Sequence, residues 1–167
     1  MATTTLGIIR ATLVARLEAL TVASGRLTTD IAGRGRSALT QHSPAVWSFD
    51  VLQAPHASDD RTFLLRWQGG MRDVGPTSQA ERRTQIDAAL DILYYVPADE
   101  HADDVDMRIQ QDALDIDKDL TDWLETGPLA GMLPTTAVTS DSPPMEHPSG
   151  AALVKRIALL IDFWRAG

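Results

Sequence analysis

Residues 84–96 read Thr-Gln-Ile-Asp-Ala-Ala-Leu-Asp-Ile-Leu-Tyr-Tyr-Val, with an apolar side chain at every second position. Because successive side chains of a strand point to opposite faces of a sheet, this alternation predicts a strand with one face in a core. The other face is mixed, with Asp87 and Asp91 near its start and Leu93 and Tyr95 near its end. A strand of this length spans about 43 Å, far more than the usual 5–6 residues. Such a strand belongs at the centre of a sheet, or reaches a neighbouring subunit.

Two stretches before it also alternate. In residues 46–52 we expect Trp47, Phe49 and Val51 to face the core, and residues 62–68 follow after a short polar turn. A short polar connection between two strand patterns is typical of an antiparallel hairpin. The sequence therefore predicts that 46–52, 62–68 and 84–96 form a three-stranded meander.

The last strand pattern covers residues 152–164 and is mostly apolar on both faces. This predicts a strand inside the sheet or against a neighbouring subunit. A helix is the alternative for this stretch, because residues 154, 157, 160 and 161 also fit a helical stripe, but the β-branched and aromatic content favours a strand. Residues 135–139 form a shorter candidate strand.

Two helices are predicted by apolar residues at spacings of three and four. The first spans residues 3–23, with Ile8 and Val14 widening its stripe and Gly25 placed to end it. The second spans residues 99–125, with Asp103 as its expected cap. The face opposite its apolar stripe is acidic and is expected to be solvated or to face a basic partner; it carries Asp104, Asp106, Asp112, Asp115, Asp119 and Asp122.

These elements predict one α+β domain over residues 1–167, a mostly antiparallel sheet with two amphipathic helices packed on it. Flexible loops are expected at about 25–44, 69–82 and 127–150, where Gly, Pro and Ser interrupt every period. The net charge of −8 argues against a general nucleic-acid binder. No apolar run approaches the ~18 residues of a membrane span, and no signal pattern begins the chain, so we expect a protein folded in a cytoplasm.

The residues indicate neither an enzyme nor a cofactor or metal site. The chain has no cysteine, and its four histidines have no metal-ligand spacing and are expected on the surface. Asp115, Asp117 and Asp119 resemble the start of a calcium loop, but Leu120 stands where that loop needs glycine. Asp87 and Asp91 share a strand face and are expected to be a solvent-facing or interface-facing pair.

The order of segments resembles one known family. An amphipathic helix is followed by a loop with Gly and Arg, then by strands ending in a long strand preceded by Arg82 and Arg83. An acidic helix and a Pro/Gly-rich connection lead to the closing strand at 152–164. This order is similar to that of the tail terminator, or head-to-tail joining, proteins of long-tailed bacteriophages and phage-like particles. The resemblance covers nearly the whole chain as architecture, and the loops at 25–44 and 127–150 are longer than in compact members.

The resemblance implies a structural virion protein that forms a hexameric ring on the end of the tail tube. Such a ring stops tube polymerisation and offers a surface to the head-side connector. The implied partners are further copies of the chain, the tail tube protein, a connector or stopper protein and the genomic DNA that passes through the ring, with no membrane. The implied place is the tail or neck of a virion assembled in the host cytoplasm. The candidate interface or DNA-facing residues are Arg26, Arg34, Arg36, Arg72, Arg82, Arg83, Asp87 and Asp91.

Other interpretations stay open at this stage. Closely related ones are another neck or connector protein and a tail tube protein. From a different class, the chain is a small α+β enzyme or ligand-binding domain with a pocket between sheet and helices near Asp87, Asp91 and Tyr95. A small dimeric scaffold protein is a third option. The state of assembly distinguishes them, because a terminator forms rings whereas an enzyme is a small oligomer with a polar pocket.

Overall fold

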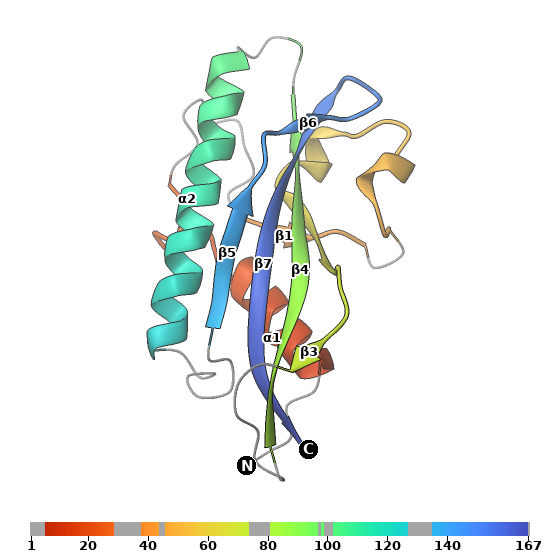
Figure 1. The fold of residues 1–167 in the computed structure, drawn as a ribbon. Coiled ribbons are helices and arrows are strands. Elements are labelled where there is room, and N and C mark those ends of the chain that lie inside the picture. Colours follow the sequence, from red (N-terminus) through yellow and green to blue (C-terminus); the bar gives the residue numbers. More distant parts are fainter. Residues whose placement is uncertain are drawn as a thin grey trace.

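The computed structural model of this chain describes residues 6–28, 38–43, 46–73, 81–96, 98, 102–126 and 135–166. Within these ranges, side chains are described except at 81–82, 102, 123–126, 135–141 and 164–166. The described residues form an α+β fold, a mostly antiparallel sheet with two α-helices on one of its faces (Figure 1). The predicted fold class is confirmed.

Seven strands make up the sheet in the described ranges. They are β1 (Thr40–Gln41), β2 (Thr62–Trp67), β3 (Arg72–Asp73), β4 (Glu81–Tyr95), β5 (Thr135–Asp141), β6 (Met145–Glu146) and β7 (Ala152–Ala166). The order across the sheet is β1-β2-β4-β7-β5, with β3 beside β4 and β6 beside β7. Every pair is antiparallel except β1 with β2.

Strands β4 and β7 form the centre of this sheet. Each has 15 residues, and they pair along their full length, from Glu81 opposite Ala166 to Tyr95 opposite Ala152. The two long strands predicted at 84–96 and 152–164 are confirmed, and the helix alternative for 152–164 is wrong. Figure 1 shows the two strands running past the lower ends of α2 and β5 as a narrow ribbon.

The two helices are α1 (Leu6–Glu18) and α2 (Ala102–Thr126). Both place their predicted apolar stripes against the even-numbered residues of β4, in one buried cluster. Burying a large aliphatic side chain contributes about 1.5–3 kcal/mol, so this cluster is the main source of stability. It includes Ile9, Leu13 and Leu17 of α1, Val105, Ile109, Ile116 and Leu120 of α2, and Ile86, Leu90, Ile92 and Tyr94 of β4.

The end of α1 and the start of α2 both differ from the prediction. The first helix stops at Glu18, because residues 21–24 form a turn in which Thr21 and Ser24 bond each other's backbone N–H through their hydroxyls. Gly25 has a left-handed φ of +73° beyond that turn and does not end the helix. Ile8 is exposed and does not widen the stripe. In α2, Asp103 lies inside the first turn and is not the cap, since the helix begins at Ala102.

The strand predicted at 46–52, and with it the three-stranded meander, is wrong. Residues Phe49–Val51 form a short 3₁₀ helix, η1, because the hydroxyl of Ser48 accepts a hydrogen bond from the N–H of Asp50. Phe49 is buried as predicted, but Trp47 is 69% exposed and Val51 47% exposed. The alternation of these residues was too short to distinguish a strand from a helical turn with one buried residue. A second 3₁₀ helix, η2 (Ala57–Asp59), precedes β2.

The helix η1 covers one end of the sheet face that points away from α1 and α2. Phe49 packs there with Leu64 of β2, Leu93 of β4 and Val154 of β7 in a second, smaller cluster. Figure 1 shows η1 (orange) on the opposite side of the strands from α2. The rest of this face has no helix over it in the described part of the chain.

Candidate functional site

The sheet face opposite the helices gathers four of the eight candidate residues singled out from the sequence, Arg72, Arg83, Asp87 and Asp91. We call its part beyond η1 the outer face. It is lined by Arg66 of β2, Arg72 of β3, Arg83, Asp87, Ala89 and Asp91 of β4, and Arg156, Ala158, Leu160 and Asp162 of β7. These positions alternate along β4 and β7 with the residues of the main core, so the period of two in the sequence determines which side chains reach this face.

Asp91 lies between two arginines at the end of the outer face next to η1. Arg156 stands directly opposite it on β7 and donates to both carboxylate oxygens, at 2.7 and 2.9 Å. Arg66 donates to Asp91 Oδ2 at 2.6 Å and to the carbonyl of Trp47. The hydrogen bonding of Arg156 to the Asp91 carboxylate raises the pKa of Arg156 above its ordinary value. The carboxylate is buried, whereas the arginine side chains are 29% and 35% exposed.

Asp87 pairs with Arg72, which comes from the short strand β3. The guanidinium donates to both carboxylate oxygens, at 2.9 and 3.3 Å, and each side chain is about half exposed. The hydrogen bond from Arg72 lowers the pKa of the Asp87 carboxyl below its ordinary value. This pair lies at the surface, unlike the buried Asp91.

The fourth ion pair of the outer face joins Arg83 to Asp162, at 2.6 Å. Asp162 is buried and Arg83 is 39% exposed. The Nε atoms of Arg83 and Arg66 are buried and have no hydrogen-bond partner in the described part of the chain.

The arrangement does not suit acid–base chemistry. Asp87 and Asp91 are four positions apart on one strand, which separates their Cα atoms by about 13 Å, too far to share a proton. The two share one strand face as predicted, but only Asp87 faces solvent: Arg72 pairs with the half-exposed Asp87, whereas Arg66 and Arg156 hold the buried Asp91. They also lie on the face away from the helices. The alternative prediction of a pocket between sheet and helices near these two aspartates is therefore wrong.

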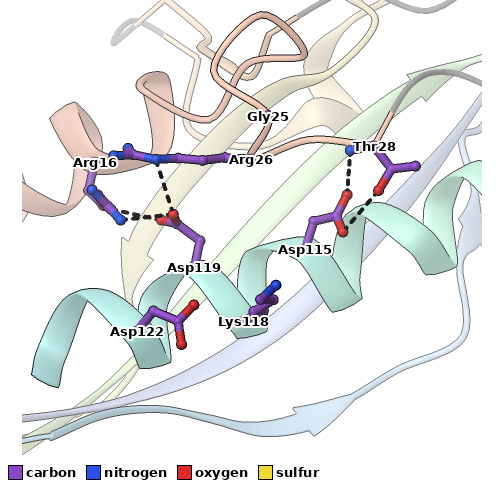
Figure 2. Close-up of a pocket in the computed structure, with 8 residues that line it drawn as sticks. All are labelled: Arg16, Gly25, Arg26, Thr28, Asp115, Lys118, Asp119 and Asp122. Atoms are coloured by element: carbon purple, nitrogen blue, oxygen red, sulfur yellow. Dashed lines mark hydrogen bonds and ion pairs between the residues drawn. The ribbon is translucent and has the colours of Figure 1, made fainter.

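Arg26 lies elsewhere, in a hollow of about 340 Å³ between the turn after α1 and the side of α2 (Figure 2). Arg16 donates two hydrogen bonds, of 2.7 and 2.8 Å, to the carboxylate of Asp119. Arg26 forms an ion pair with the same carboxylate at 3.6 Å. Asp115 accepts from the backbone N–H of Thr28 at 2.7 Å. Asp115 and Asp119 thus tie α1 and residues 26–28 to α2, which is a structural role.

A third charged cluster is buried between β4, the start of β2 and α2. Arg61 donates two hydrogen bonds of 2.9 Å to Asp112, and each side chain is 1% exposed. The hydroxyl of Tyr94 donates to Asp112 at 2.9 Å, and Arg108 pairs with Asp60 at 3.2 Å. Burial raises the pKa of the Tyr94 hydroxyl well above its ordinary value, with the charge of Asp112 adding to the shift. Perturbed groups often mark active sites, but a substrate in solvent does not reach these atoms.

The prediction that the acidic face of the second helix is solvated is wrong for two residues. Asp112 and Asp119 are buried, 1% and 7% exposed. Asp112 follows Ile109 by three residues and precedes Ile116 by four, so helical spacing already placed it on the core side. Arg61 was missed because it stands alone beside a turn, in a left-handed conformation with φ of 54° that its hydrogen bonds to Asp112 help to hold.

The other predicted residues divide as follows. Arg34 and Arg36 lie outside the described residues, and for Arg82 only the backbone is described, opposite Arg165 in the β4–β7 ladder. His147 is buried, contrary to the prediction, because its Nε2–H donates to the carbonyl of Phe49 at 2.8 Å.

Within the described ranges, no three histidine, aspartate or glutamate side chains lie together in a way that could hold a metal ion. In the same ranges, no helix is both long and apolar enough to cross a bilayer. Comparison of the chain with protein-family models and with curated protein sequences gave no match.

Proposed function

We propose that this chain is a structural subunit of a phage-type tail, and that a ring of its copies caps the tail tube and joins it to the head-side connector. The observation that carries the proposal is the outer face. In the described part of the chain, both α-helices lie on one side of the sheet, and the other side beyond η1 presents small and apolar residues among arginine–aspartate pairs. An uncovered face of this kind is suited to contact with another protein.

The chemistry of the outer face supports a protein partner more than DNA. Each of its arginines is already paired with a carboxylate, so little net positive charge is available for phosphates. The chain as a whole carries −8. A ring of such subunits would repel DNA from its wall and let it pass without sticking.

The ribbon of β4 and β7 gives the subunit a second feature suited to assembly. It extends past the helices (Figure 1), and a projecting two-stranded ribbon can reach a neighbour in a ring or the rim of a tube. The α+β architecture with two helices on one face also agrees with the fold that the resemblance implies.

The test of this function is to mix the purified chain with the tail tube protein encoded in the same genome. Tube lengths are measured by negative-stain electron microscopy. We expect tubes that stop growing and carry an added density at one end. An unrelated acidic protein of similar size serves as the control. Tubes of unchanged length without the chain at their ends would overturn the proposal.

A further inference from the structure

We propose that His147 is an acid-sensitive switch, which holds the turn of residues 147–150 against η1 while its imidazole is neutral and releases that turn when the imidazole is protonated. The switch works within one chain, so it does not depend on the proposed function in a tail. The hydrogen bonds of both ring nitrogens, the burial of the ring and the place of the turn beside the second cluster support this assignment.

One nitrogen of the His147 ring joins the turn to η1. Nε2 lies 2.8 Å from the carbonyl oxygen of Phe49, 98 residues away in the sequence. A carbonyl oxygen only accepts hydrogen bonds, so Nε2 carries a proton and donates it. The same carbonyl accepts from the backbone N–H of Leu52, which ends η1. The imidazole therefore attaches the turn to the carbonyl that closes η1.

The other nitrogen of the ring has the opposite requirement. Nδ1 lies 3.1 Å from the backbone nitrogen of Ser149, and an amide N–H only donates. Nδ1 is therefore unprotonated and accepts this bond, and it also lies 2.7 Å from the hydroxyl of Ser149. The Phe49 carbonyl and the Ser149 amide together fix a neutral ring with its proton on Nε2.

Protonation of Nδ1 conflicts with these contacts. The added N–H would point at the N–H of Ser149, so two donors would face each other. The hydroxyl of Ser149 can turn and accept from Nδ1, but the amide of Ser149 then has no acceptor. The new charge would also lie on a side chain that is 2% exposed, and burial disfavours the charged form of a histidine. A protonated ring is therefore more stable in solvent, and leaving its site breaks its bond to Phe49.

The ring has no charged partner in the described part of the chain. Its polar contacts there are the three bonds to Phe49 and Ser149. Asp50 of η1 and Glu146 of β6, the charged side chains on the two segments that the ring joins, are both exposed. Solvent and salt screen their charges, so they do not replace a direct partner for a buried imidazolium.

The charged groups on the strands around the ring are engaged elsewhere. Arg66, Asp91 and Arg156 bond one another on the outer face. Lys155 lies on the helix side of β7, opposite a residue of the main core. The outer side of β4 also carries Tyr95, and tyrosine is ordinarily neutral at neutral pH. None of these groups bonds the imidazole.

A second histidine touches η1 from another side. The ring of His42 packs edge-on against that of Phe49, with 5.6 Å between the ring centroids. Its Nε2 lies 3.3 Å from a carboxylate oxygen of Asp59, which favours a charged imidazole. Protonation of His42 therefore strengthens a contact, whereas protonation of His147 breaks one.

The release opens one end of the second cluster. Ala152, which begins β7 after the turn, is 1% exposed and packs there with Phe49, Leu64 and Val154. The backbone N–H of His147 donates to the carbonyl of Ala152 at 2.9 Å, so the turn is tied to this strand end. When the ring moves into solvent, we expect the turn and β6 to detach while the centre of β4 stays in place.

The size of the effect follows from proton linkage. A solvent-exposed histidine ordinarily takes up its proton at about pH 6.5, and the contacts of the closed turn exclude that proton. The closed turn is therefore most stable above this pH and loses stability as the pH decreases below it. The population of the open turn should rise about 10-fold between about pH 7.5 and about pH 5.5.

Hydrogen exchange followed by mass spectrometry tests this switch on the full chain, because it reads each peptide separately in any state of assembly. The peptide of residues 145–152 contains the bonded amides of His147, Ser149, Gly150 and Ala151. After correction for the intrinsic effect of pH on exchange, we expect its protection to fall about 10-fold between about pH 7.5 and about pH 5.5. A peptide from the centre of β4 should keep its protection.

Two matched variants identify the group responsible. His147→Gln keeps an N–H that can donate to the Phe49 carbonyl but has no titrating nitrogen, so residues 145–152 should be equally protected at both pH values. His42→Gln removes the other histidine beside η1 and should leave the loss of protection unchanged. If His147→Gln does not fold, seen as lost protection in β4, the pH dependence in the native chain still decides.

Equal protection of residues 145–152 at both pH values in the native chain would overturn the switch. A loss that persists in a folded His147→Gln variant would do so too, as would a loss that disappears in His42→Gln. A loss of the same size in β4 would indicate global acid unfolding and would also contradict a local release.

Discussion

Replacing Asp112 with alanine lowers the free energy of unfolding by about 3–5 kcal/mol, the usual cost of removing one partner from a buried ion pair. The Arg61 guanidinium stays buried without its carboxylate, and the hydroxyl of Tyr94 loses its acceptor. Since domains are stable by only about 5–15 kcal/mol, this variant should be close to unfolding at 37 °C. Urea unfolding followed by circular dichroism measures the change.

The matched control for this variant is Asp117→Ala. Asp117 lies on the same helix but is exposed, so its removal should change stability by no more than about 0.5 kcal/mol. In the double variant Arg61→Ala with Asp112→Ala, the loss should be smaller than the sum of the two single losses, because each single change strands the other charge. Equal losses for Asp112→Ala and Asp117→Ala would contradict this account of the network.

Replacing Asp91 with alanine should cost about 2 kcal/mol. The change leaves Arg66 and Arg156 facing each other across the strands without the carboxylate that both contact. The cost is smaller than for Asp112, because both arginines reach solvent and keep part of their hydration. Thermal and urea unfolding measure it.

Asp87→Ala is the matched control on the same strand and the same face. Its pair with Arg72 is half exposed, so the change should be within the range of surface ion pairs, at most about 1 kcal/mol. We expect the difference between the two variants to persist in high salt, which screens the exposed pair and hardly affects the buried carboxylate. Equal destabilisation by the two changes would mean that Asp91 does not organise the outer face.

The sequence predicted the parts of the fold that depend on local period. The alternation in β4 and β7 and the helical stripes of α1 and α2 were long enough to identify the elements and the side chains that each buries. Residues 46–52 failed because a few alternating residues also fit a 3₁₀ turn, and the bond from Ser48 to Asp50 decides between them.

The candidate site needed the strand register, which the sequence does not contain. Arg83, Asp87 and Asp91 could be placed on one face of a strand from their odd positions. That Asp91 meets Arg156 follows only from the pairing of β4 with β7, two strands 65 residues apart at that point. The same holds for Arg61 and Asp112, which come together only when α2 packs on the sheet.

The measurement that tests the central claim most directly is the mass of the purified chain in solution, by light scattering over a concentration series. The account predicts particles of about six chains of 18.2 kDa each, whose mass stops rising with concentration because the head-to-tail contacts close into a ring. A stable two-chain particle would contradict it. So would a single-chain mass at ~1 mM protein, where even a contact of about 4 kcal/mol would be half occupied.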